Sequence, residues 1–466
     1  MPTSPNLLFV TTDHQRADSL FMTQAGIEVT PHLNRLARES VNFTRAYTTC
    51  PLCAPARTAL ATGLYPTTTG VTWNEWAGTT AREGKPLHQH LAEAGYDLAH
   101  AGMQHVTTAP KLHERVKFSL WLTDQDHGRH LKERGLANWP ADDMEGFKRP
   151  ILETRFEGQP NPTHLSFVRT AEWPNDEAHF KDLWIVEQAL AYLESRRAER
   201  EKPFALFVNI WAPHPPLWVP HSWWRKFDRA RLDLPPNVGL EGPGEPANRR
   251  KGVAGQLGAG VPLEQWREVW GAHLDLVHMA DALIGRLWAK VRDLGVDDRT
   301  ALAFMSDHGD HLGQHAKYQK MEMYEPAARV PLFLRLPGVA PSVIDGPVSH
   351  LHVMPTLLEA LGQKAPEGLH ARSLYADCRA GRLAAEEPVF GQFSGCGGIG
   401  DLRRMIVLGP WKYIYDPCDR AELYHVLDDP LELANRAGEP GLAGLQRDLH
   451  ARLKAWHEAK GDFVKY

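Results

Sequence analysis

The sequence predicts an α/β fold, in which a large, mostly parallel central sheet flanked by helices is followed by a small C-terminal α+β domain. Over most of the 466 residues, apolar runs of strand length alternate with amphipathic stretches of helical spacing, which is the pattern of parallel βα units. Near residue 380 this alternation gives way to short strands and one terminal helix. The chain is therefore expected to form a large domain, 1–380, and a small domain, 381–466.

The expected elements begin with Leu7–Thr11, an apolar run that reads as a buried strand. Pro31–Arg38 and Arg57–Thr62 are expected to be short helices. Trp184–Arg197 is expected to be a helix that leads into the strand Phe204–Ile210.

The second half of the large domain contains one long amphipathic stretch. Apolar residues keep helical spacing from Leu274 to Val291, and this helix leads into the strand Ala301–Met305. Two segments, about Thr123–Asn175 and Leu234–Gly260, are polar or rich in Pro and Gly, so we expect long loops there.

The C-terminal segment contains three short apolar runs that predict strands, at Val389–Phe393, Met405–Leu408 and Trp411–Tyr415. A terminal helix is expected at about Leu442–Glu458. The intervening Gly395–Gly400 fits the spacing G-x-G-x-x-G, but a strand rather than a helix is expected after it. It is therefore no dinucleotide-binding signature.

Composition excludes several classes of function. The net charge of −5 gives no basic footprint for a nucleic acid. The longest apolar runs are strand-sized, so no membrane span is predicted. The N-terminus carries no basic segment followed by an apolar one, so a cytoplasmic location is expected. Five cysteines in a chain of this length do not suggest a disulfide framework, so reduced thiols are expected.

The segment from Cys53 to Pro66, CAPARTALATGLYP, is the most informative stretch of the chain. It resembles the signature of the sulfatase family, C-x-P-[SA]-R followed by a short helix and T-G. The resemblance implies an alkaline-phosphatase-like fold and the conversion of Cys53 to formylglycine by a formylglycine-generating enzyme. The hydrated aldehyde has a chemical advantage, because a gem-diol that carries sulfate can collapse to the aldehyde and release sulfate without attack by water at sulfur.

The sequence allows two other interpretations of Cys53. It could be a buried structural cysteine, or it could form a redox or metal-binding C-x-x-C pair with Cys50. The sequence has no second C-x-x-C for zinc and no thioredoxin-like unit around this one. The fourteen-residue match outweighs both alternatives.

Further motifs resemble those of the sulfatase family and occur in the family's order, over nearly the whole chain. They are Asn6–Asp18, Thr30–Ala37, Pro213–Pro216, Ser306–His315 with Lys320, Tyr324, Glu325 and Arg329–Pro331, and finally Gly409–Tyr413 with Glu422–Tyr424.

The resemblance implies one divalent metal ion bound by Asp13, Asp307, His308 and the modified Cys53. Asp13 and Asp307 each follow an apolar strand, where ligand-binding groups of α/β sheets lie. A single aspartate there would more simply cap a helix, but two in matching motifs favour a metal site. Many sulfatases carry a second aspartate where this chain has His14. The missing acid favours Mn²⁺ and leaves Ca²⁺ open.

The resemblance also assigns catalytic roles. Arg57, which could otherwise be a surface helix residue, would hold the formylglycine and the anion. Lys320 and His214 would contact the ester group, with His214 as the acid that protonates the leaving group. His105 would be the base that ejects sulfate.

One departure from the family pattern concerns substrate preference. Met103 stands where the family carries a sulfate-binding lysine. The related phosphonate monoester hydrolases also lack this lysine, and they have an asparagine at the position of Asn74, which is therefore a candidate substrate-binding residue. His105 favours a sulfatase, and we expect measurable phosphonate or phosphodiester activity beside sulfatase activity.

The sequence thus predicts a hydrolase of small-molecule sulfate esters, without nucleic-acid or membrane partners; a homo-oligomer is compatible with it. Phosphonate monoester or phosphodiester hydrolysis with the same nucleophile is the alternative, and a non-catalytic binding protein on this fold is a more distant one. Some of the fifteen tryptophans could line a substrate pocket. The ones close to motifs are Trp73, Trp76, Trp211 and Trp218.

Overall fold

The central feature of the computed structural model is an eight-stranded sheet. The model describes residues 4–74, 84–137, 146–154, 160–199 and 201–466. In sheet order the strands are β14 (Ser342–Ser349), β4 (Val41–Tyr47), β13 (Arg329–Arg335), β12 (Thr300–Ser306), β1 (Asn6–Thr12), β10 (Phe204–Asn209), β5 (Asp97–Gly102) and β6 (Leu120–Leu122). Only β13 runs antiparallel to its neighbours. The prediction of a mostly parallel sheet is confirmed.

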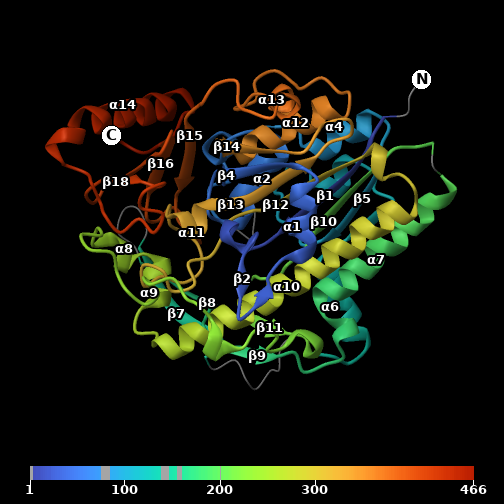
Figure 1. Ribbon diagram of the computed structural model, residues 1–466, viewed down its shortest axis with the longest axis horizontal. Coiled ribbons are helices and arrows are strands. Elements are labelled where there is room, and N and C mark those ends of the chain that lie inside the picture. The colour runs from blue at the N-terminus through green and yellow to red at the C-terminus, as the bar shows by residue number, and fades with distance from the viewer. Residues whose placement is uncertain (1–3, 75–83, 138–145, 155–159, 200) are drawn as a thin grey trace.

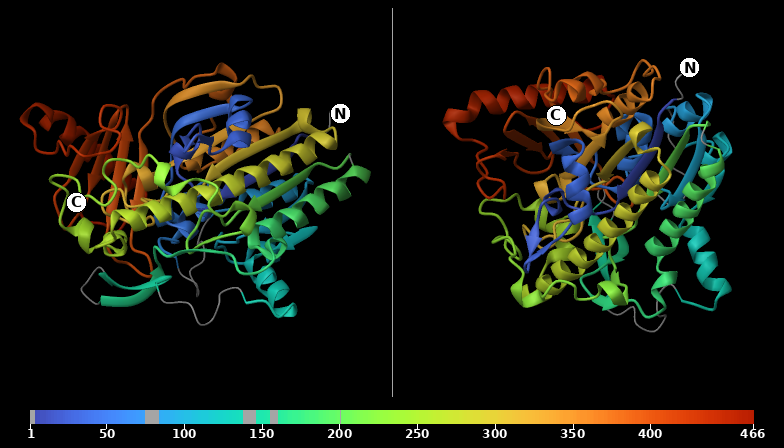
Figure 2. Two further views of the ribbon diagram at one scale, coloured as in Figure 1. Left: turned by 60° about the horizontal axis from the view of Figure 1, so that its bottom comes forward. Right: turned by 45° about the vertical axis from the view of Figure 1, so that its right-hand side comes forward.

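Helices cover both faces of this sheet (Figures 1 and 2). All seven residues of β1 are buried, and alternate side chains enter two different hydrophobic cores. Leu8 and Val10 pack into one core, and Leu7 and Phe9 pack into the other. One face carries α1 (Pro31–Arg38), α7 (Lys181–Ser195) and α10 (Leu263–Asp293); the other carries α2 (Cys53–Thr62), α4 (Leu87–Glu93), α12 (Val353–Ala360) and α13 (Tyr375–Ala380).

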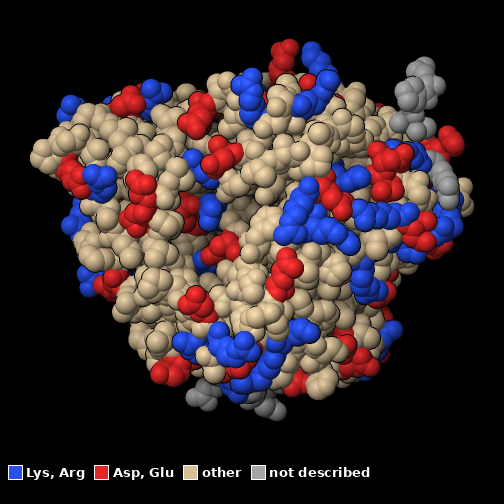
Figure 3. Space-filling view, viewed as in Figure 1, with Lys and Arg blue, Asp and Glu red and all other residues tan. Residues whose placement is uncertain are grey.

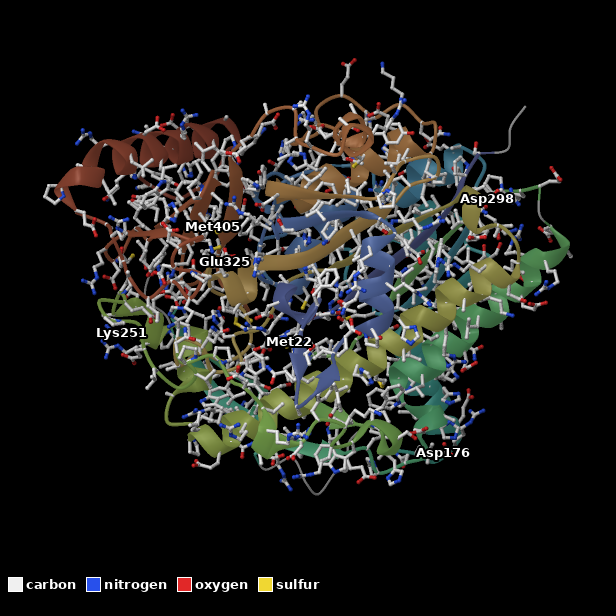
Figure 4. All side chains as sticks on the ribbon, in the orientation of Figure 1. Met22, Asp176, Lys251, Asp298, Glu325 and Met405 are labelled. Carbon is white, nitrogen blue, oxygen red and sulfur yellow. The ribbon has the colours of Figure 1, made fainter. Side chains whose placement is uncertain are left out.

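The C-terminal domain is a four-stranded antiparallel sheet with one long helix against it. Its elements are β15 (Val389–Phe393), β16 (Arg403–Leu408), β17 (Trp411–Tyr415), β18 (Glu422–His425) and α14 (Ala443–Ala459). The buried ammonium of Lys412 joins this sheet to the large domain, because it lies 2.6 Å from Glu325 (labelled in Figure 4) as well as 2.8 Å from Glu432. The expected C-terminal domain is therefore present, while its boundary at 380/381 stays a prediction.

The expected loop at about Thr123–Asn175 is wrong. This segment contains α6 (Asp124–Glu133), β9 (Thr170–Glu172) and a two-stranded ribbon of β7 (Lys148–Thr154) and β8 (Pro160–Ser166). The side chains of β8 alternate between exposed and half-buried positions and none is fully buried, so this strand lacks the buried apolar side chains that predict a strand.

The expected loop at Leu234–Gly260 is largely irregular but contains two short helices, α8 (Asn248–Lys251) and α9 (Val253–Gly258). The long helix α10 starts eleven residues before the predicted Leu274, because Trp266, Val269 and Trp270 already pack in the core. The remaining short elements are β2 (Thr23–Gln24), β3 (Ile27–Glu28), α3 (Pro66–Thr69), α5 (Leu112–Arg115), β11 (Leu217–Val219) and α11 (Glu325–Ala328).

On the face shown in Figure 3, acidic and basic side chains are interspersed. In the described part of the chain, no helix combines the length and the apolar character that a bilayer crossing needs.

Candidate active site

Strands β1 and β12 and helix α2 bring four candidate metal ligands together at the carboxyl ends of the parallel strands. The parallel strands β1 and β12 are neighbours and end side by side at Thr12 and Ser306, so the next residues, Asp13 and Asp307, leave the sheet together. The first residue of α2, Cys53, faces them.

The ligand atoms of this group, which includes His308, all lie within 4.8 Å of one another. The Cys53 Sγ lies 3.6 Å from Asp13 Oδ1 and 3.4 Å from His308 Nε2. The same His308 nitrogen lies 3.6 Å from Asp307 Oδ1. All four side chains are buried.

The chemistry of this donor set fits a divalent cation. His308 Nδ1 is 3.0 Å from the Gly309 carbonyl oxygen, to which it donates, and this leaves the Nε2 lone pair toward the carboxylates. Burial lowers the pKa of His308 to about 3 and so keeps the imidazole neutral. Burial, reinforced by Asp307, raises the pKa of Asp13 to about 7, so the nearby Lys320 and Arg57 offset only part of the cost of burying this carboxylate. A bound cation would satisfy both groups.

The Cys53 thiol stands where the formylglycine oxygen would be. Burial, and after it the charge of Asp13, raises the pKa of the thiol. A protonated thiol is a poor nucleophile, so the unmodified side chain is unsuited to attack. Cys50 is buried and unpaired but lies outside the donor cluster, which argues against the metal-binding C-x-x-C alternative.

Arg57 connects the two aspartates through its guanidinium. Its Nε donates to Asp307 Oδ2 at 2.8 Å, and its Nη2 lies 3.4 Å from Asp13 Oδ2. Its Nη1 donates to Thr11 at 3.0 Å and to Asn209 at 3.3 Å. Burial opposes ionisation of Asp307, but the nearby Arg57 outweighs it and the pKa of Asp307 is held at about 2.

Lys320 contacts the nucleophile position from another side. Its Nζ lies 2.7 Å from Cys53 Sγ and 4.0 Å from Asp13 Oδ1. The same Nζ donates to His14 Nε2 at 2.8 Å, while His14 Nδ1 lies 2.7 Å from Asp310 Oδ2. The chain Asp310–His14–Lys320 therefore fixes the direction of the ammonium.

His214 and Asn74 flank this centre. The His214 ring lies 4.3 Å from the His14 ring and 4.1 Å from the Trp211 ring, measured between centroids. Its Nδ1 donates to the Pro215 carbonyl oxygen. Asn74 accepts a hydrogen bond from the Ala54 backbone N–H at 2.9 Å and so braces the start of the nucleophile helix.

His105 follows β5 and lines a cavity of about 30 Å³ together with Arg57, Met103 and Asn209. Burial lowers the pKa of His105 to about 3, so the imidazole is neutral. The structure thus brings all nine residues proposed from the sequence to one region.

Of the four tryptophans that lie close to sequence motifs, Trp76 is outside the described residues.

Several residues that hold the site are not predicted from the sequence. Thr11 and Asn209 are paired near the carboxyl ends of the adjacent strands β1 and β10, and both accept a hydrogen bond from Arg57. The rule that functional groups follow strand ends could have found Asn209. His14 is more than the replacement of an acid, because its ring accepts a hydrogen bond from Lys320 and contacts Asp310.

Comparison with family models covers most of the chain. The model described as Sulfatase matches residues 5–363. The chain belongs to the sulfatase family. A second model, described as N-sulphoglucosamine sulphohydrolase, C-terminal, matches residues 313–459 of this sulfatase-family chain.

Individual relatives agree with this assignment. A choline-sulfatase from Rhizobium meliloti (strain 1021) is 28% identical over 94% of this chain and 83% of its own length. A multifunctional alkaline phosphatase superfamily protein, PehA, from Trinickia caryophylli is 28% identical over 99% of this chain and 96% of its own. The solved structure of a phosphonate monoester hydrolase from Silicibacter pomeroyi superposes with a TM-score of 0.76 at 21% identity, over 98% of this chain and 96% of that one. The alkaline-phosphatase-like fold is thereby confirmed.

Proposed function

We propose that this sulfatase-family hydrolase cleaves small-molecule sulfate monoesters with a formylglycine derived from Cys53, beside one divalent metal ion. The observation that carries the proposal is the contact of the buried Cys53 Sγ with Asp13, His308 and Lys320. Membership of the family makes the chain a sulfuric ester hydrolase, and these contacts support Cys53 as its reactive position.

Asp13, Asp307, His308 and the oxygen of the modified Cys53 would hold the metal. When bound, the metal supplies positive charge that stabilises negative charge on the transferred group. We propose Mn²⁺ ahead of Ca²⁺, because the donor set contains an imidazole and because the neutral His14 replaces a carboxylate.

Lys320 and Arg57 are the cations that would meet the sulfate group. Burial opposes their charge, but the surrounding Cys53, Asp13 and Asp307 outweigh it and raise the pKa of both side chains, so both stay protonated. Because Arg57 and Lys320 are already fixed by hydrogen bonds, little reorganisation is needed when negative charge develops.

His214 and His105 would handle the protons. Burial, followed by Lys320, lowers the pKa of His214 well below its usual value. A bound anionic ester beside the ring would favour the imidazolium, which then protonates the departing oxygen. His105 is neutral and would take the proton whose removal expels sulfate.

Hydrolysis of phosphonate monoesters or phosphodiesters is the alternative function. Met103, in place of the lysine, and Asn74 support it, and a phosphonate monoester hydrolase shares the fold. We propose that phosphonate monoesters or phosphodiesters are secondary substrates, and that a formylglycine-generating enzyme matures Cys53. A cytoplasmic location and a homo-oligomeric state stay predictions from the sequence.

The test compares kcat/KM for an aryl sulfate, an aryl phosphonate monoester and an aryl phosphodiester with the purified mature enzyme. We expect the sulfate to be the preferred substrate and at least one phosphorus ester to be turned over more slowly. If the phosphonate is hydrolysed far faster than any aryl sulfate, the alternative function is correct. If the active enzyme hydrolyses none of them, the proposal is wrong.

A further inference from the structure

A second hollow, also of about 30 Å³ and open to solvent, adjoins the reaction centre at His214. Its walls are mainly aromatic. They are formed by Trp173, Phe180, Trp211, Trp218, His127, Lys181, Ala212, His214, Pro216 and Leu276.

The hollow lies where the leaving group of an ester would extend. His214 belongs both to its wall and to the reaction centre, because the His214 ring contacts the ring of His14 and His14 accepts from Lys320. A group whose oxygen meets His214 can therefore continue past Trp211, whose ring lies against His214.

Among the described residues that line this hollow, Lys181 is the only Lys or Arg and none is a carboxylate. The Lys181 Nζ lies 4.1 Å from the centroid of the Trp211 ring. Among the described residues, no carboxylate forms an ion pair with it. The adjacent Asp182 instead accepts the backbone N–H groups of Trp211 and Ala212, at 2.7 and 2.9 Å.

An aromatic face compensates a partly buried cation only in part, so Lys181 is left able to pair with an anion. The wall also offers a second donor. The buried indole nitrogen of Trp173 has no hydrogen-bond partner in the described part of the chain. Aromatic surfaces combined with an unneutralised ammonium and a free N–H match a ring that carries an acceptor or a negative charge.

We propose that this hollow is a leaving-group subsite for an aromatic ring with an anionic substituent, such as a carboxylate, and that Lys181 determines this preference. The inference rests on the proposed sulfate ester hydrolysis, of which it specifies the substrate class. A leaving group with a quaternary ammonium would meet a like charge in place of an acid, so the same residue disfavours cationic esters.

The test uses phenyl sulfate, 4-carboxyphenyl sulfate and 4-(trimethylammonio)phenyl sulfate with the wild-type enzyme and with Lys181→Met. For each substrate the ratio of wild-type to variant kcat/KM is taken, because this ratio cancels the intrinsic reactivity of the leaving group. We expect the carboxylate substrate to lose about 10- to 100-fold, as for the loss of a charge-assisted hydrogen bond. Phenyl sulfate should change by less than about threefold, and the cationic substrate should gain.

Lys454→Met on α14 is the matched control and should leave all three rates unchanged. An equal loss for the three substrates would show that Lys181 only supports Trp211, and no change would show that it does not contact substrate; either result overturns the subsite. A measurement on the wild type needs no variant: 4-hydroxybenzoate should inhibit at lower concentration than phenol, and equal inhibition would contradict the proposal.

Failure of the subsite and failure of the proposed function give different results. Turnover of all three sulfates with the same response to Lys181→Met contradicts only the subsite. If no sulfate is turned over, the proposed function fails, and the same three leaving groups on phosphonate monoesters then test the subsite directly.

Discussion

Asp307→Asn is the substitution that most directly probes the metal centre. Asp307 is fully buried and is one of two carboxylates in the donor cluster. It also accepts the 2.8 Å hydrogen bond from Arg57 Nε. The amide is nearly isosteric but neutral, so it removes one anionic ligand and leaves the buried guanidinium with Asp13, at 3.4 Å, as its remaining carboxylate partner.

Two magnitudes follow from this geometry. Loss of one partner from a buried ion pair costs about 3–5 kcal/mol of folding stability. Changing a group that only supports a metal ligand lowers metal affinity about 10- to 100-fold, so removal of a ligand should lower it by at least about 100-fold. We therefore expect metal-depleted protein with almost no turnover. Elemental analysis of metal per chain, kcat with an aryl sulfate and thermal unfolding measure the three effects.

Asp275→Asn is the matched control. Asp275 is also fully buried and pairs with the buried Arg229 at 2.7 Å, but it lies outside the donor cluster. The Asp275→Asn variant should lose a comparable amount of folding stability, but it should retain its metal and its specific activity. Full activity and full metal content in Asp307→Asn would refute the metal assignment, and metal loss in both variants would attribute the effect to general destabilisation.

Other predictions concern the nucleophile, the proton acceptor, the missing lysine and the metal. Cys53→Ala should fold but lose nearly all turnover, whereas Cys50→Ala should keep most of it; equal losses would indicate a C-x-x-C function. His105→Ala should release sulfate slowly, seen as a burst of phenol before a slow steady state; an unchanged rate would remove its assigned role. Met103→Lys should raise the ratio of sulfate to phosphonate kcat/KM by about 10-fold, as for one added charged donor; a constant ratio would contradict this. Chelation should abolish activity and Mn²⁺ or Ca²⁺ should restore it, and full activity in metal-free protein would exclude the metal.

Elements with a strong local pattern could be predicted closely. Helix α1 has the expected bounds Pro31–Arg38, and β15 and β17 have the expected bounds as well. The continuous apolar run in β1 predicted a strand buried on both faces, and the strand is buried at every residue. The secondary structure of these segments follows from residue propensities and from the spacing of apolar residues, and both can be seen in the sequence.

The strand β8 could not be predicted, because it pairs with β7 along its length but has no buried side chain that would mark a core-facing side. The site residues, too, could be predicted only in part. Motif positions placed Asp13 and Asp307, since both follow strands, but the sheet order that brings β1 beside β12 is a tertiary property. The role of His14 likewise depends on a distant partner, Lys320.

The mass of the peptide that contains Cys53 tests the central claim most directly. Trypsin cleaves after Arg45 and Arg57, so one peptide, 46–57, contains both Cys50 and Cys53, and fragmentation distinguishes them. In active enzyme we predict that Cys53 has exchanged one sulfur and two hydrogen atoms for one oxygen, while Cys50 remains a thiol. Fully active protein with an unmodified Cys53 would contradict the account.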